Sequence, residues 1–183
     1  MLSLSTPTPH SRKEYLELCQ KRWHEFILKN RNYYVFYIRP SSSKDISIYS
    51  KVNTELGKNY FQKLEEKKCP YAILLAYQSD DSIRFGWAFK HPTEKWDKHY
   101  GLNTAINKSL DLPPLTVNEI DKILNHEWLK KTKNRKLVQA VRIFFERCKK
   151  KYQTGVRSGM SENLSNEIVY DVINKLFPKK GSR

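Results

Sequence analysis

The chain has 183 residues and carries 34 Lys and Arg against 19 Asp and Glu, a formal net charge of +15. Its apolar content of 39% and aromatic content of 13% exclude a disordered chain and are enough for a buried core. No stretch approaches the roughly 18 apolar residues of a membrane span, and Met1–His10 lacks the parts of a secretory signal. We therefore expect a cytoplasmic protein with no membrane partner.

The three cysteines are far apart and form no CxxC pair. This pattern predicts reduced thiols and argues against a zinc site. The sequence predicts no bound metal and no other cofactor.

The first expected element is a helix that begins at Ser11 and ends near Lys29. Ser11 and Glu14 have the spacing of a capping box, in which each side chain satisfies a free backbone N–H group. Apolar residues then recur at helical spacing and predict a buried stripe of Leu16, Cys19, Trp23, Phe26 and Ile27.

Between residues 32 and 91 the apolar period changes to two, which is typical of strands. We predict strands at 33–39, 45–52, 71–77 and 82–91, with a short helix at 59–68. The last two strands flank the polar residues 78–81 and are expected to form a hairpin.

The second strand of this hairpin has two unlike faces. One carries large side chains, and the other carries Arg84, Gly86, Ala88 and Lys90. The small face leaves room for a helix or a ligand to approach the backbone, and a packed helix is the favoured interpretation.

After Pro92 the pattern becomes mainly helical, with helices expected at 102–110, 116–131, 134–152 and 161–176. Thr116 and Glu119 repeat the capping-box spacing at the start of the second of these helices, and in the last one we expect Leu164 to be buried. The predicted fold class is α+β: an antiparallel sheet of about four strands, an N-terminal helix and a helical C-terminal half. We divide the chain into a sheet domain at 1–112 and a basic helical region at 113–183 that packs on it.

The positive charge is concentrated near the C-terminus. Between Lys130 and Lys151 there are ten Lys and Arg residues, and Glu146 is the only acid. Such a local excess is typical of proteins that bind phosphate backbones, whereas a solvated helix face normally carries counter-charges. The predicted nucleic-acid contacts are Lys131, Lys133, Arg135, Lys136, Arg142, Lys149, Lys150, Lys151 and Arg157, with Lys95 and Lys98 as a second patch.

Aromatic residues accompany basic ones in the sheet region, where Tyr33, Tyr34, Phe36 and Tyr37 precede Arg39. Single-stranded nucleic acid is held by basic grooves with aromatic rings on which bases stack. The competing interpretation, which we favour for most of these rings, is a place in the hydrophobic core.

A short motif follows the hairpin: Glu94, Trp96, Lys98, Gly101 and Ala105. It resembles small phage- and plasmid-borne proteins of unassigned function, in which a hairpin runs into a helix with this spacing. Leu102 departs from the Arg of that family, which puts an anion contact at this position in doubt. The resemblance implies a mobile-element setting. Lys95, Lys98 and His99 also precede a helix N-terminus, where a phosphate is favoured; alternatively, Trp96 fastens the turn to the core.

We expect the protein to bind DNA or RNA through its phosphates, as a component of a nucleoprotein (for RNA, ribonucleoprotein) complex. Two alternatives stay open. One is an accessory or inhibitor protein of a mobile element that binds a protein partner. The other is a metal-dependent nuclease that uses Glu94 and Asp97 between His91 and His99. No catalytic residue is assigned, and the sequence does not distinguish RNA from DNA.

Overall fold

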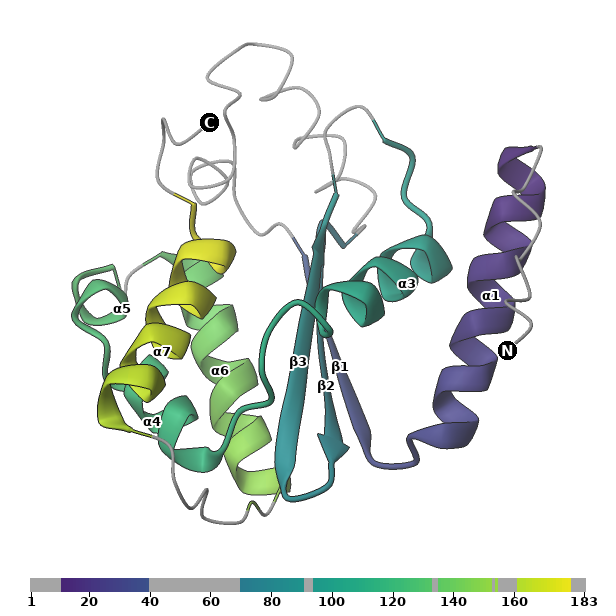
Figure 1. Ribbon diagram of the computed structural model, residues 1–183. Helices are drawn as coiled ribbons and strands as arrows, with labels where there is room; N and C mark the ends of the chain where they lie inside the picture. The colour runs from purple at the N-terminus through teal and green to yellow at the C-terminus, as the bar shows by residue number, and fades with distance from the viewer. Residues whose placement is uncertain are drawn as a thin grey trace, which may run out of the picture.

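The computed structural model describes residues 11–39, 70–90, 94–132, 135–152, 154 and 161–178. In this part of the chain the fold has three layers (Figure 1). A twisted antiparallel sheet lies in the middle, α1 and α3 cover one face, and α4 to α7 cover the other. The predicted α+β class is confirmed. None of the described helices is both long enough and apolar enough to cross a membrane.

The described sheet has three strands in the order β1-β2-β3: Tyr33–Ile38, Ala72–Ser79 and Ser82–Phe89. We predicted about four strands. Three of these are present, with ends shifted by one or two residues, while the predicted strand at 45–52 and helix at 59–68 lie outside the described residues. The count of four is therefore wrong for the described sheet.

The predicted hairpin is confirmed, but its turn is shorter than 78–81. Ser79 pairs with Ser82, so only Asp80 and Asp81 connect the strands. Asp80 has a φ of 50°, a left-handed conformation that aspartate tolerates better than most residues. The Gln78 amide donates to the carbonyl of Asp80 at 2.6 Å and fixes this turn.

The two faces of the sheet are packed differently. Gly86 pairs with Leu75, and Ala88 with Ile73, on the face that α3 covers. A Cβ atom on Gly86 would lie 1.9 Å from the carbonyl oxygen of Ala105 in α3. The preferred interpretation of the small face, a closely packed helix, is confirmed.

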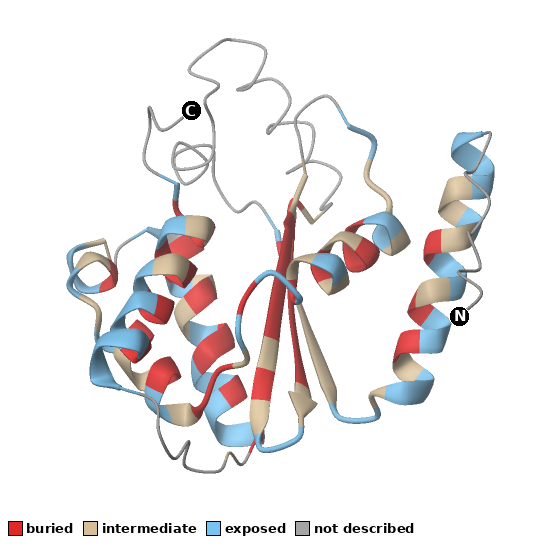
Figure 2. Cartoon of the chain, in the orientation of Figure 1, coloured by how far each residue is buried: buried red, intermediate tan, exposed pale blue. Residues whose placement is uncertain are grey.

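Helix α1 spans Arg12–Lys29 and begins as predicted, since the Ser11 hydroxyl accepts from the Glu14 N–H at 3.2 Å. Cys19, Trp23 and Phe26 are buried, and Trp23 and Phe26 pack with the aromatic residues of β1 and β2. Figure 2 shows that the remaining surface of α1 is largely exposed.

Helix α3 spans Lys98–Lys108, whereas the predicted helix covered 102–110. It begins earlier because Asp97 caps it: the carboxylate accepts the Tyr100 N–H at 2.8 Å. The sequence analysis missed this cap, since no Glu or Gln follows Asp97 at the capping-box spacing.

The predicted helix 116–131 is two helices, α4 (Val117–Asn125) and α5 (Glu127–Lys131). They are separated at His126, whose backbone is extended and whose Nδ1 accepts the Trp128 N–H at 3.2 Å. The N-terminus of α4 agrees with its predicted capping box, because the Thr116 N–H donates to the Glu119 carboxylate at 2.6 Å.

Helix α6 spans Lys136–Lys151, and α7 spans Glu162–Leu176. In α7 we expected Leu164 to be buried, but it is 47% exposed and Ser165 takes the inward position. The Ser165 hydroxyl donates to the buried Glu119 carboxylate at 3.2 Å, a polar contact that the apolar pattern does not reveal. The main core combines side chains from both predicted parts, 1–112 and 113–183.

Candidate nucleic-acid interface

Helix α6 forms the centre of the predicted interface. It carries six Lys and Arg residues and one acid, Glu146. Its apolar residues Leu137, Val141, Phe144 and Cys148 are buried against the sheet and the neighbouring helices. The basic residues are therefore distributed over the two flanks of the helix and the side that faces solvent.

One flank of α6 faces α4. The Arg142 guanidinium donates to the carbonyl of Leu124 at 3.0 Å, and the Lys149 ammonium lies 2.5 Å from a carboxylate oxygen of Asp121. We predicted both as phosphate contacts. Instead the structure gives each a partner in α4, which fastens the two helices together.

The other flank faces β1, which is an edge strand of the described sheet. The Lys151 ammonium donates to the Tyr33 carbonyl at 2.7 Å, and the Arg147 guanidinium donates to the Tyr34 hydroxyl at 3.0 Å. Arg147 also lies over the ring of Phe36, with its Cζ atom 5.6 Å from the ring centroid. This cluster of Tyr34, Phe36, Arg147 and Lys151 is called the β1–α6 cluster below.

The acceptors on these flanks are mostly uncharged. Arg142 and Lys151 donate to backbone carbonyls, and Arg147 donates to a hydroxyl. A neutral acceptor fixes the position of a cation and leaves its full positive charge in place. Among the described residues of α6, only Lys149 forms an ion pair with a carboxylate.

The other predicted contacts fall into three groups. Arg135 and Lys150 are exposed, and no ion pair engages them within the described residues. Lys131 is exposed and lies 3.4 Å from Glu127 on its own helix, α5, where such a pair contributes little. Lys133 and Arg157 lie outside the described residues, as does the side chain of Lys136.

Arg147 was not among the predicted contacts. It is exposed and lies one helical turn before Lys151, so both reach the same flank. Tyr34 and Phe36 are two residues apart on a predicted strand and so share one face. This pair of spacings would have identified the cluster, given the knowledge that α6 lies beside β1.

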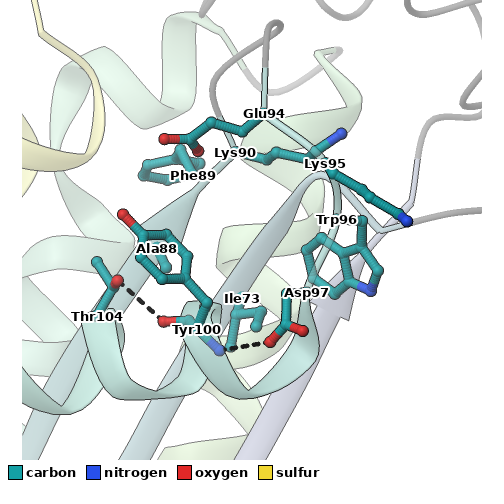
Figure 3. A pocket seen from close by; sticks show the side chains of 11 residues that line it. Ile73, Ala88, Phe89, Lys90, Glu94, Lys95, Trp96, Asp97, Tyr100 and Thr104 are labelled. Atoms are coloured by element: carbon teal, nitrogen blue, oxygen red, sulfur yellow. Dashed lines mark hydrogen bonds between the residues drawn. The ribbon is translucent and has the colours of Figure 1, made fainter. Parts of the chain in front are cut away.

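The second predicted patch lies on the opposite layer, where α3 begins (Figure 3). A cavity of about 130 Å³ opens there between Phe89, Glu94, Lys95, Trp96 and Tyr100. An adjoining cavity of about 260 Å³ lies between the beginnings of α1 and α3. Lys95 borders both cavities, and Lys98 is exposed in the first turn of α3.

The N-terminus of α3 already holds a negative group. The Asp97 carboxylate accepts the Tyr100 N–H at the position where we considered a phosphate. Trp96 packs against the core on the α1 and α3 side, in agreement with the alternative in which it fastens the turn.

The glycine of the hairpin–helix motif also has a packing role. A Cβ atom on Gly101 would lie 2.7 Å from the Cδ1 atom of Ile73. Gly101 lacks this atom, and Gly86 leaves room for the carbonyl of Ala105. Both glycines therefore allow α3 to lie close to the sheet. The close packing of α3 on the hairpin thus accounts for Gly101 and Ala105 of the motif.

Within the described ranges, no group of three His, Cys, Asp or Glu side chains is arranged to hold a metal ion. His91, one residue of the nuclease alternative, lies outside those ranges. Asp97, a second residue of that alternative, caps α3. The described residues therefore give no geometric support to the nuclease alternative.

The chain was compared with known proteins at three levels. No protein-family model matches it. No curated protein and no solved structure matches it either. The function proposed below therefore rests on the residues of this chain alone.

Proposed function

We propose that the protein binds nucleic acid through the phosphate backbone, within a nucleoprotein complex, and that the exposed side of α6 with the adjoining edge of β1 is the main contact surface. The observation that carries the proposal is the uncompensated charge of α6. Three of its cations donate to neutral acceptors, and Lys150 is exposed without an ion pair among the described residues.

Charge of this kind favours a polyanion. Adjacent like charges on a helix destabilise it, and a phosphate backbone relieves that repulsion while counterions are released. Arg147, Lys150 and Lys151 follow one another at spacings of three and one, so they lie together near the end of α6. A structural role alone would be served equally well by carboxylate partners, as Asp121 serves Lys149.

The geometry favours contacts that do not depend on base sequence. A helix of 16 residues is about 24 Å long, so its side spans several phosphates of one strand. Lysine and arginine side chains on a helix flank contact phosphates as backbone anchors. We expect about three or four phosphates to be neutralised by α6 and its neighbours.

The test is fluorescence anisotropy of the full chain with labelled DNA and RNA over a series of salt concentrations. The variant carries Arg135→Glu with Lys150→Glu. The matched control carries Lys13→Glu with Lys21→Glu, two exposed positions on α1 in the opposite layer. We expect the α6 variant to weaken binding about tenfold or more. The steepness with which the logarithm of the binding constant falls with the logarithm of the salt concentration (the salt slope) should decrease by about two. The control should change both quantities much less.

Two results would contradict the proposal. Wild-type protein that binds no probe at low salt would exclude nucleic-acid binding and direct attention to a protein partner. Equal losses in the α6 variant and the α1 control would place the contact elsewhere. Including magnesium and checking the probes for cleavage tests the nuclease alternative in the same experiment.

A further inference from the structure

We infer that the β1–α6 cluster is a stacking site for an unpaired base, so that the protein prefers single-stranded nucleic acid to a duplex. This inference rests on the proposed function and names its substrate class. Two features carry it: the fixed guanidinium of Arg147 above Phe36, and the exposure of that guanidinium at the edge of the described sheet.

Arg147 is held in place from two directions. The Tyr34 hydroxyl accepts from its Nη1 atom at 3.0 Å, and the Phe36 ring lies below it at 5.6 Å. An exposed arginine normally loses much side-chain freedom when it binds a ligand, whereas this one is already ordered. Its outer plane is therefore available to stack against a nucleobase at a small entropic cost.

The rings beneath Arg147 are supported by the core. Tyr34 stacks on Phe144 with ring centroids 5.6 Å apart and an angle of 14° between the planes. Phe144 is fully buried and also lies 6.4 Å from Phe36. Both rings of the cluster are therefore packed against the core.

The position of the cluster on the sheet also matters. Among the described strands, β1 pairs only with β2. The β1 residues from Tyr33 to Tyr37 are half-buried, whereas the β2 residues opposite them are buried. Tyr34 and Phe36 therefore belong to the core on one side and reach the surface on the other.

A single strand fits this arrangement better than a duplex. In a duplex both faces of each base are covered by its neighbours, so a planar cation can meet only phosphates and base edges. An unpaired base can leave its stack and lie on the guanidinium, in the order Phe36, Arg147, base. Lys150 and Lys151 lie beside Arg147 on α6 and are placed to contact the flanking phosphates.

The test compares three probes of equal length: a thymidine single strand of about 16 nucleotides, an abasic single strand, and a duplex. The abasic strand keeps the phosphates and removes the stacking partner. We expect wild-type protein to bind the thymidine strand about tenfold more tightly than the abasic strand. Arg147→Lys, which keeps the charge and removes the plane, should bring that ratio close to one and leave the salt slope unchanged.

Two further variants separate stacking from folding. Arg22→Lys makes the same change on α1, in the opposite layer, and should leave the ratio unchanged. Tyr34→Phe removes the hydroxyl that orients Arg147 and keeps the ring, so it should lower the ratio about two- to threefold. Partial unfolding would weaken binding to all probes equally, and the ratio is insensitive to it.

The outcomes distinguish this inference from the function on which it rests. If wild-type protein binds the thymidine and abasic strands equally, or the duplex as tightly as the single strand, the stacking site is wrong and phosphate binding survives. If Arg147→Lys and Arg22→Lys give the same ratio, the base stacks elsewhere. If none of the three probes binds at low salt, the proposed function itself fails.

Discussion

The two faces of the sheet are covered in different ways. On one face α3 approaches so closely that Gly86 lies against the backbone of Ala105, and α1 adds only its buried stripe. On the other face α6 is kept further away by aromatic side chains: Phe144 and Phe145 interlock with Phe85, with ring centroids 5.0 to 5.6 Å apart. Small residues thus set the close approach of α3 to the sheet, and packed aromatic rings set the position of α6.

This difference indicates where function can reside. In the α1 and α3 layer, the unusual residues Gly86, Gly101 and Trp96 are accounted for by packing. In the α4 to α7 layer, packing accounts for the apolar side of α6 and leaves the net charge of that helix uncompensated. Residues whose chemical type is not explained by packing are the better functional candidates.

The largest expected loss of stability follows from removing an aromatic ring between the sheet and α6. Phe144→Ala removes a fully buried ring that contacts Tyr34, Phe36, Phe85 and Phe145, and should lower the free energy of unfolding by about 4 kcal/mol. Phe26→Ala removes a ring at the margin of the other layer, 8% exposed, and should cost about 3 kcal/mol. Chemical denaturation measures both. A larger loss of stability for Phe26→Ala than for Phe144→Ala would contradict the view that ring packing matters more in the α4 to α7 layer.

The next effect tests the close approach of α3. Gly86→Ala places a methyl group 1.9 Å from a backbone oxygen, which cannot move without shifting the helix, and should cost about 3 kcal/mol. Gly101→Ala meets only the end of the Ile73 side chain at 2.7 Å, and alanine favours the helix by about 1 kcal/mol, so its net effect should be close to zero. Comparable losses in thermal stability for the two variants would contradict this interpretation.

The smallest effect concerns Tyr152, at the end of α6. Its hydroxyl donates to the buried Ala76 carbonyl at 3.1 Å, so Tyr152→Phe should cost about 1 kcal/mol near neutral pH. Burial raises the pKa of Tyr152, and the neighbouring Cys148 and Tyr34 raise it further. Below the ordinary tyrosine pKa of about 10 both states are protonated; above it the unfolded state ionises first, and stability falls.

The free energy of unfolding, measured from pH 8 to about pH 11, tests the predicted loss of stability at high pH. Tyr152→Phe should lose less stability over the alkaline range than wild type, because it lacks the group that ionises only on unfolding. Parallel curves for the two proteins would show that Tyr152 does not contribute to the alkaline loss.

The sequence predicted the elements well where a local pattern dictates them. The capping boxes at Ser11 and Thr116 gave the beginnings of α1 and α4, and the alternation along 82–91 gave the packed small face of β3. It failed where the determinant is a single polar contact. The helix break at His126 and the inward turn of Ser165 depend on hydrogen bonds that no apolar period reveals.

The candidate interface was only partly predictable. Charge density directed attention to α6, but spacing within one helix does not tell which flank meets another element. Arg142 and Lys149 were therefore predicted as free contacts, although both are engaged by α4. Arg147 was omitted because its contact with Tyr34 depends on β1, more than a hundred residues earlier in the chain.

The bridge between Ile83 and Leu115 has a consequence for solubility. The chain crosses from the α3 layer to the α4 layer in front of β3 (Figure 1), and there Leu115 exchanges two backbone hydrogen bonds of 2.7 Å with Ile83. An open strand edge is a template on which a second molecule can add a strand and begin aggregation. Pro113 and Pro114 precede Leu115 and lack N–H groups, so this part of the covering segment offers no backbone donor to a further strand. The crossing connection therefore occupies the outer backbone groups of β3 at Ile83, so a second molecule cannot add a strand at that point.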